Sequence, residues 1–254
     1  MTAATVLDLK KLHGLIVEAK DILARGGGKI TFRKIDLSKI MVVTSLDASF
    51  AKEEGLKSQS GFCSMICSSD VITGPTICNL VEYQSVRISR VVKSTMAAES
   101  AALSTALDRQ LYLRLLVESM LHGEPETNED WRHQLKIPGV LVTDARSLFD
   151  HINKTGSLPT ERQTLIDLLV ARDLVEANAV KVCWVPTTHQ LADVFTKMMK
   201  PPPVMEKFLR TGFYSLVQTD LEGQGEEHRA ALRQAQRQRR KERDKSKKDL
   251  KPTE

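Results

Sequence analysis

The sequence contains no apolar stretch of the roughly 18 residues that a membrane-spanning helix needs. Its N-terminal segment also lacks the charged region leading into an apolar one that marks a secretory signal. We therefore expect neither secretion nor insertion into a membrane. The 254 residues are 41% hydrophobic and 27% charged, which is ordinary for a folded chain of one or two domains.

Cysteine is scarce, and its spacing excludes the common zinc modules. The four cysteines form no Cys-x-x-Cys pair and have no histidine nearby at zinc-finger spacing. Cys63 and Cys67 have the parity of side chains on one face of a strand, which favours packing in a core. We predict buried thiols in a reducing compartment at Cys63, Cys67, Cys78 and Cys183.

The excess of positive over negative charge lies in the C-terminal segment. Residues 226–254 contain 11 Lys and Arg against 6 Asp and Glu, which accounts for the whole net charge of +5. This basic tail, which we place at 219–254, favours salt-sensitive binding to a nucleic-acid backbone or recognition as a nuclear-import signal. It has no aromatic side chain to stack on bases, and the alternative is a solvated, partly helical tail without a specific role.

The first predicted element is an amphipathic helix. Apolar residues recur at steps of three and four over residues 5–24, which predicts a helix with one apolar face. The glycines at 26–28 end this helix, and Ile30 and Phe32 alternate with polar neighbours as in a short strand. The apolar positions of the helix are Leu9, Leu12, Ile16, Ala19 and Leu23.

The centre of the chain is predicted to form strands followed by a long helix. Apolar and β-branched runs between turn-forming residues indicate an antiparallel meander, in which the run at 40–46 is buried. A leucine every four residues then predicts a helix from an N-cap at Thr95 to about residue 121, before a polar loop at 122–138. The other strands of the meander are predicted at 61–67, 76–82 and 86–92.

The last part of the chain alternates strands and helices. Pro186 opens a helix with Thr187 or Thr188 as its N-cap, and this helix carries His189 and Asp193. Further strands are predicted at 139–143 and 180–185, further helices at 145–153 and 160–178, and a short apolar segment at 204–218.

Asp47 and Asp144 follow two compact apolar strands. Neighbouring strands lie only about 4.8 Å apart, so two adjacent parallel strands would bring these carboxylates into repulsion unless a cation is present. Magnesium prefers carboxylate oxygens, and two such ions activate water and stabilise the leaving oxygen in phosphodiester cleavage. Glu99, in line with the core-facing leucines of the long helix, and Asp193 complete a set of four acids.

Each of these acids also has an ordinary explanation. An aspartate after a strand is most often a turn former or a helix cap, and a glutamate in a first helical turn interacts favourably with the helix dipole. Four acids in the order strand end, helix start, strand end, helix start form a more specific pattern than any one of them.

Three segments around the acids carry a family resemblance. Residues 185–197 read Val-Pro-Thr-Thr-His-Gln-Leu-Ala-Asp-Val-Phe-Thr-Lys, residues 143–148 read Thr-Asp-Ala-Arg-Ser-Leu, and residues 47–51 read Asp-Ala-Ser-Phe-Ala. With these motifs, residues 5–218 resemble the ribonuclease H region of copia-type LTR retrotransposon polyproteins. The closing motif of that family is Val-Pro-Thr, a short spacer and Gln-Leu-Ala-Asp-(Ile/Val)-(Phe/Leu)-Thr-Lys.

The resemblance implies a role for each acid. It makes Asp47 the first acid, Asp144 the third and Asp193 the acid of the closing motif. Residues 94–99 resemble the family's Ser-Ser-Thr-Glu-Ala-Glu block with one extra residue and without its first glutamate, which leaves Glu99 as the second acid. An extra residue at a helix start turns a side chain by about 100°, but the leucine row keeps Glu99 directed at the core.

The fold implied by the resemblance is ribonuclease H-like, an α/β domain at 39–218 with a mixed five-stranded sheet flanked by helices. Residues 1–38 then correspond to a remnant of the connection to an upstream reverse transcriptase domain. The chain has neither a Tyr-x-Asp-Asp polymerase motif nor an integrase-like metal motif. We expect a processed fragment, a decayed copy or a host gene made from one, acting inside the cell in the nucleus or in a cytoplasmic particle.

The implied activity is hydrolysis of the RNA strand of RNA/DNA hybrids. Two Mg²⁺ ions, for which Mn²⁺ substitutes, would be held by Asp47, Glu99, Asp144 and Asp193, and neither an organic cofactor nor a membrane is expected. His189 would assist proton transfer or product release, or merely stabilise the helix it shares with Asp193. The alternative is a catalytically inactive or host-adopted module that keeps the fold and binds nucleic acid or protein.

Overall fold

The computed structural model describes residues 5–24, 28–53, 56–123, 131, 135–153, 158–197 and 201–216. Within these stretches the strands are β1 (Ile40–Glu53), β2 (Lys57–Ser68), β3 (Thr76–Arg87), β4 (Gly139–Thr143), β5 (Lys181–Trp184) and β6 (Phe213–Tyr214). The α-helices are α1 (Val6–Ala24), α2 (Thr95–His122), α4 (Arg146–Asn153), α5 (Arg162–Glu176) and α6 (Pro203–Thr211). Short 3₁₀ turns are η1 (Leu37–Lys39), η2 (Ser69–Ile72), η3 (Thr187–His189) and η4 (Ala192–Phe195).

The strands form one mixed sheet in the order β5-β4-β1-β2-β3-β6. β1, β2 and β3 are an antiparallel meander, whereas β4 and β5 run parallel to β1. This arrangement confirms the α/β sheet with flanking helices that the ribonuclease H-like prediction requires. The sheet has six strands within the described residues instead of the predicted five, because the short strand β6 pairs with the start of β3.

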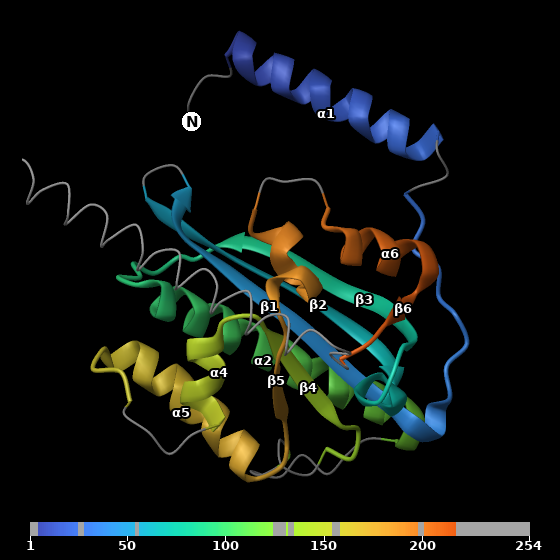
Figure 1. Ribbon diagram of the computed structural model, residues 1–254, viewed down its shortest axis with the longest axis vertical. Helices are drawn as coiled ribbons and strands as arrows, with labels where there is room; N and C mark the ends of the chain where they lie inside the picture. Colours follow the sequence, from blue (N-terminus) through green and yellow to red (C-terminus); the bar gives the residue numbers. More distant parts are fainter. Residues whose placement is uncertain are drawn as a thin grey trace, which may run out of the picture.

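Helices α2, α4 and α5 cover one face of the sheet, and α6 with η3 and η4 covers the other (Figure 1). The strand pleat separates the two cores. On β1, Leu46 and Ala48 belong to the core under α2, whereas Met41 and Val43 belong to the core under α6. The second core also contains the predicted buried thiols Cys63, Cys67 and Cys78, with the half-buried Cys183 packed against them.

Two predictions about strands are wrong. The segment at 30–32 forms no strand, and next to it a side chain satisfies the backbone of Arg33: Arg33 N donates to Asn79 Oδ1 at 2.8 Å, and Asn79 Nδ2 donates to Arg33 O at 2.7 Å. Instead of two strands at 76–82 and 86–92 there is the single strand β3, which ends at Arg87, so residues 88–92 form no strand. β3 continues through its polar second half. Polar residues are tolerated there because their side chains are largely exposed.

Two boundaries also differ from the prediction. β1 does not end before Asp47 but continues to residue 53, because β2 pairs with it on both sides of Asp47. The N-cap of α2 is Ser94, not Thr95, since Ser94 Oγ accepts a hydrogen bond from Ala97 N at 3.1 Å. Both residue types cap helices well, so the sequence alone does not distinguish them.

The predicted N-terminal helix is confirmed as α1, and none of its residues is buried. The basic tail at 219–254 lies outside the described residues, and the domain boundaries at 38 and 218 stay predictions. None of the described helices is long and apolar enough to cross a membrane.

Candidate active site

Strands β1 and β4 bring two of the predicted acids together. They pair in parallel with Ser45 opposite Val142, so the same register carried two residues further puts Asp47 opposite Asp144. Neighbouring strands are about 4.8 Å apart. The two strands are therefore adjacent and parallel, the arrangement in which their carboxylates repel without a cation, although Asp47 lies inside β1 and only Asp144 follows a strand end.

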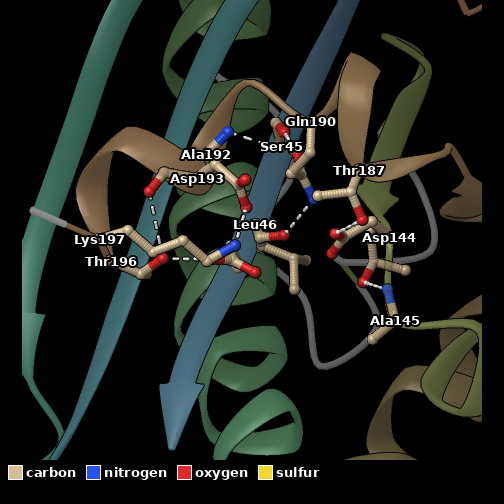
Figure 2. Close-up of polar contacts among 12 residues, drawn as sticks. Ser45, Leu46, Asp144, Ala145, Thr187, Gln190, Ala192, Asp193, Thr196 and Lys197 are labelled. Atoms are coloured by element: carbon tan, nitrogen blue, oxygen red, sulfur yellow. Dashed lines mark hydrogen bonds and ion pairs between the residues drawn. The ribbon is translucent and has the colours of Figure 1, made fainter. Parts of the chain in front are cut away.

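The third acid comes from the segment after β5. The turns η3 and η4 replace the single helix predicted after Pro186. The chain between them is anchored by the buried amide of Gln190, whose Nε2 donates to Leu46 O at 2.8 Å and whose Oε1 accepts from the Ser45 hydroxyl (Figure 2). Because this amide is bonded to β1, η4 and its Asp193 are held against that strand.

A glycine makes room for η4. Gly61 of β2 lies opposite Asp47 in the register. A Cβ atom at Gly61 would lie 2.5 Å from Phe195 Cβ, which is closer than real side chains approach. Gly61 therefore allows η4 to pack directly on the backbone of β2. The only signal for this role in the sequence is a glycine inside an apolar strand, which marks close approach of another segment.

Three carboxylates meet where these segments converge. Asp47, Asp144 and Asp193 each present an oxygen, and the three oxygens lie within 4.8 Å of one another. Asp47 and Asp193 are buried and Asp144 is half-buried. Like charges this close repel, and carboxylate oxygens are the ligands that Mg²⁺ prefers. The set of donor atoms therefore fits a divalent cation.

Two threonines hold the carboxylates of this cluster. Thr196 Oγ1 donates to Asp47 Oδ2, and Thr187 Oγ1 donates to Asp144 Oδ2 at 2.7 Å (Figure 2). Each bond fixes the orientation of one carboxylate, as the partners of metal-binding side chains commonly do. No pattern in the sequence singles out these two threonines, although both lie within the closing motif at 185–197.

Glu99 lies beside the three aspartates, but outside the group of oxygens within 4.8 Å of one another. Its side chain is buried on α2, and its Oε2 atom has no hydrogen-bond partner among the described residues. Burial, together with the charges of Asp47 and Asp144, raises the pKa of Glu99 to about 9. The predicted direction of Glu99 toward the core is confirmed, and its unpartnered oxygen is costly unless a ligand completes it.

Burial also raises the pKa of Asp47, to about 6. The hydrogen bond from Thr196 and the charge of Lys197 oppose this rise, and the charge of Asp144 adds to it. At neutral pH without a cation, Asp47 is therefore mostly ionised, whereas Glu99 keeps its proton. Positive charge entering the cluster would favour the ionised form of both.

A basic side chain lies within the cluster. Lys197 Nζ is 2.5 Å from Asp193 Oδ1 and 3.9 Å from Asp47 Oδ2 (Figure 2). Burial lowers the pKa of Lys197, but the hydrogen bond to Asp193 and the charge of Asp47 outweigh it and leave the pKa above its ordinary value. The amine is therefore charged at neutral pH. Sequence reasoning missed this residue, although it ends the closing motif.

The structure does not bring His189 into this group of acids. His189 is half-buried at the end of η3, where its Nδ1 lies 3.2 Å from Thr188 Oγ1 and its carbonyl accepts from Tyr214 OH at 3.1 Å. Because η3 and η4 are separate turns, the helical spacing that would place His189 and Asp193 on one face does not exist.

Comparisons with known proteins find ribonuclease H domains at low similarity. No family model and no curated protein matches the chain. It is similar to an N-terminal RNase H domain from Mycobacterium tuberculosis, with a TM-score of 0.40 and 14% identity over 62% of this chain and 91% of that one. RNase H1 from Halobacterium salinarum gives a TM-score of 0.38 and 17% identity, covering 61% and 94%. The protease-reverse transcriptase of prototype foamy virus gives 0.37 and 12%, covering 65% and 21%. At such TM-scores the function has to be inferred from the site itself.

Proposed function

We propose that this chain hydrolyses the RNA strand of RNA/DNA hybrids, with divalent metal ions held by Asp47, Glu99, Asp144 and Asp193. The observation that carries the proposal is the convergence of three carboxylate oxygens, from β1, the end of β4 and η4, within 4.8 Å of one another. Lys197 supplies one positive charge beside these acids, which does not balance three neighbouring carboxylates, so a further cation best explains the cluster. Mg²⁺ is the proposed metal, and Mn²⁺ is expected to substitute.

Cations bound at such a site supply an activated water and stabilise the departing 3′ oxygen of the RNA. The residues of the chain prepare the site for this chemistry. Thr196 and Thr187 orient the carboxylates of Asp47 and Asp144. Glu99 holds a proton at neutral pH in the metal-free chain and releases it when positive charge enters the cluster, because a nearby cation favours the carboxylate form.

We also propose His189 as a residue for proton transfer or product release. Its support is its place on η3, two residues after Thr187, which is bonded to Asp144. His189→Ala should slow cleavage without changing metal affinity. An unchanged rate in this variant would leave the His189 side chain without a role in the reaction, since its contact with Tyr214 is made by the backbone carbonyl.

The remaining parts of the proposal concern substrate and origin. We expect the hybrid to be recognised by backbone shape and by the 2′-hydroxyl group, with little base specificity. The motif at 185–197 supports a copia-type retrotransposon origin and an upstream reverse transcriptase partner. The charge of the segment 219–254 supports a contribution to hybrid binding, and action in the nucleus or in a cytoplasmic particle belongs to the same proposal.

The test is cleavage of an RNA/DNA hybrid labelled on either strand, with Mg²⁺ or Mn²⁺ against EDTA. We expect metal-dependent cutting of the RNA strand alone, and its loss in Asp144→Asn. The matched control is Asp70→Asn, an exposed acid paired with Lys39 outside the cluster, which should cut normally. A folded protein that cuts neither strand, or that cuts the DNA strand, would contradict the proposal, and the first of these would favour a binding module.

A further inference from the structure

One cation is already present in the acidic cluster, and it belongs to the protein. The ammonium group of Lys197 lies 2.5 Å from Asp193 Oδ1 and 3.9 Å from Asp47 Oδ2 (Figure 2). These two aspartates are also two of the three acids whose oxygens lie within 4.8 Å of one another. The lysine therefore acts on the same acids that a divalent cation would use.

The local backbone directs Lys197 into the cluster. Lys197 follows η4, and its backbone N–H donates to Asp193 O at 3.1 Å. Thr196, the residue before it, donates through its hydroxyl to Asp47. The Lys197 side chain is only 29% exposed, so its contacts differ from those of a surface ion pair, in which both partners are well solvated. The segment after Asp193 thus places a hydroxyl on Asp47 and an ammonium group beside both Asp193 and Asp47.

We propose that Lys197 is a built-in counter-ion that neutralises Asp193 and Asp47 when no metal is bound and competes with divalent cations for them. The inference rests on the proposed metal-dependent function and adds a residue that regulates metal binding. A divalent cation binds carboxylate oxygens directly, so it and an ammonium group cannot take the same oxygen positions at once. Lys197 therefore lowers the metal affinity of the site and stabilises the cluster in the metal-free state.

The test is calorimetric titration of the full-length chain with Mn²⁺, together with thermal unfolding of the same proteins in EDTA. The variants are Lys197→Met, which removes the charge, and Lys197→Arg, which keeps it. Lys39→Met is the matched control, because Lys39 forms an exposed ion pair with Asp70 at 3.2 Å. Lys197→Gln replaces the methionine variant if that protein does not fold.

We expect Lys197→Met to bind Mn²⁺ about tenfold more tightly than the unmodified chain and to melt at a lower temperature in EDTA. Lys197→Arg and Lys39→Met should bind as the unmodified chain does. Equal or weaker Mn²⁺ binding by Lys197→Met would overturn the inference, and the proposed function would still stand wherever the unmodified chain binds the metal. If Lys197→Met binds Mn²⁺ and the unmodified chain does not, the counter-ion role of Lys197 is supported and metal-dependent catalysis by the unmodified chain is contradicted. If neither protein binds Mn²⁺, both the counter-ion role and the proposed function are overturned.

Discussion

Helix α2 carries a buried ionisable side chain near each end of β4, Glu99 at one and Arg114 at the other, and their surroundings differ. Near the start of α2, Glu99 lies beside other acids, and its Oε2 has no hydrogen-bond partner among the described residues. Further along the helix, the buried Arg114 donates to three backbone carbonyls: to Ile137 O at 2.7 Å, to Ala179 O at 2.8 Å and to Leu135 O at 3.4 Å. At the basic end, the guanidinium of Arg114 is bonded to the protein at three points, whereas at the acidic end Glu99 Oε2 has no partner among the described residues.

Glu118 and Gly139 also contribute to the packing and hydrogen bonding around Arg114. Glu118 Oε2 accepts from the backbone N–H groups of Lys136 at 2.8 Å and Ile137 at 3.3 Å. A Cβ atom at Gly139 would lie 2.9 Å from Arg114 Cδ, so this glycine allows β4 to begin against the arginine. A buried charge with hydrogen-bond partners holds a fold together, whereas a buried carboxyl oxygen without one, such as Glu99 Oε2, indicates a ligand. We therefore assign stability to the Arg114 end and chemistry to the Glu99 end.

Substitution of the acids should have the largest effect, and it should fall on catalysis. Asp47→Asn and Asp144→Asn are expected to slow hybrid cleavage by about a hundredfold to ten-thousandfold, because the metal contributes several kcal/mol of transition-state stabilisation. In EDTA, both variants should melt at the same temperature as the unmodified chain or slightly higher, because one of several repelling charges is gone. Unfolding of either variant in EDTA would assign these acids to the fold instead.

Substitution of Arg114 should show the opposite pattern. Arg114→Met leaves three backbone carbonyls without their donor and removes the positive charge near Glu118, so we expect a loss of about 3–5 kcal/mol in the free energy of unfolding. Urea denaturation measures this loss. The Mn²⁺ affinity of the folded fraction should not change. A loss below about 1 kcal/mol would contradict the assignment of stability to this end.

A smaller effect is expected from the hydroxyl group that orients Asp144. Thr187→Val removes the hydrogen bond to Asp144 Oδ2 and should weaken Mn²⁺ binding by about 10-fold to 100-fold. Its stability should change little, because Thr187 is exposed. Thr188→Val is the matched control, since Thr188 is also exposed and its hydroxyl contacts His189 instead. Equal losses of affinity in both variants would show that the bond to Asp144 has no part in metal binding.

The smallest expected effect is a change of stability with pH in EDTA. The pKa values of Asp47 and Glu99 are raised to about 6 and about 9, so the folded chain keeps protons that the unfolded chain has lost. The free energy of unfolding should therefore fall as the pH rises from about 5 to about 9. Urea denaturation across this range measures the fall, which Mg²⁺ and Glu99→Gln should each reduce. A rise in stability over the same range would contradict the raised pKa values of these two buried acids.

The sequence predicted the acidic end better than the basic end. Asp47 and Asp144 were found because each follows an apolar run, and their parallel strands then meet in register. Glu99 was found from its alignment with the leucine row of α2, and Asp193 from the closing motif. Arg114 was missed because an arginine in a long helix has no pattern in the sequence that reveals its burial. Its partners come from segments far along the chain.

The errors in the fold have the same physical origin. The turns η3 and η4 exist because the Gln190 amide is bonded to β1, a tertiary contact that overrides the helical pattern after Pro186. The segment at 30–32 is not a strand, and the backbone N–H and C=O of the adjacent Arg33 are hydrogen-bonded to the Asn79 side chain instead of to another strand. Local periodicity therefore predicts helices and strands well where apolar packing determines them. It predicts them poorly where the hydrogen bonds of one polar side chain replace those of a strand pair or of a helical turn.

Anomalous diffraction from crystals soaked in Mn²⁺ would show whether the acidic end is a metal site. We predict an anomalous peak at coordinating distance from the Asp47 carboxylate, with Asp144 and Asp193 as further ligands and with Lys197 withdrawn from Asp193. A peak located elsewhere, or none at these acids with Lys197 still bonded to Asp193, would contradict the assignment of metal-dependent chemistry to this end of the sheet.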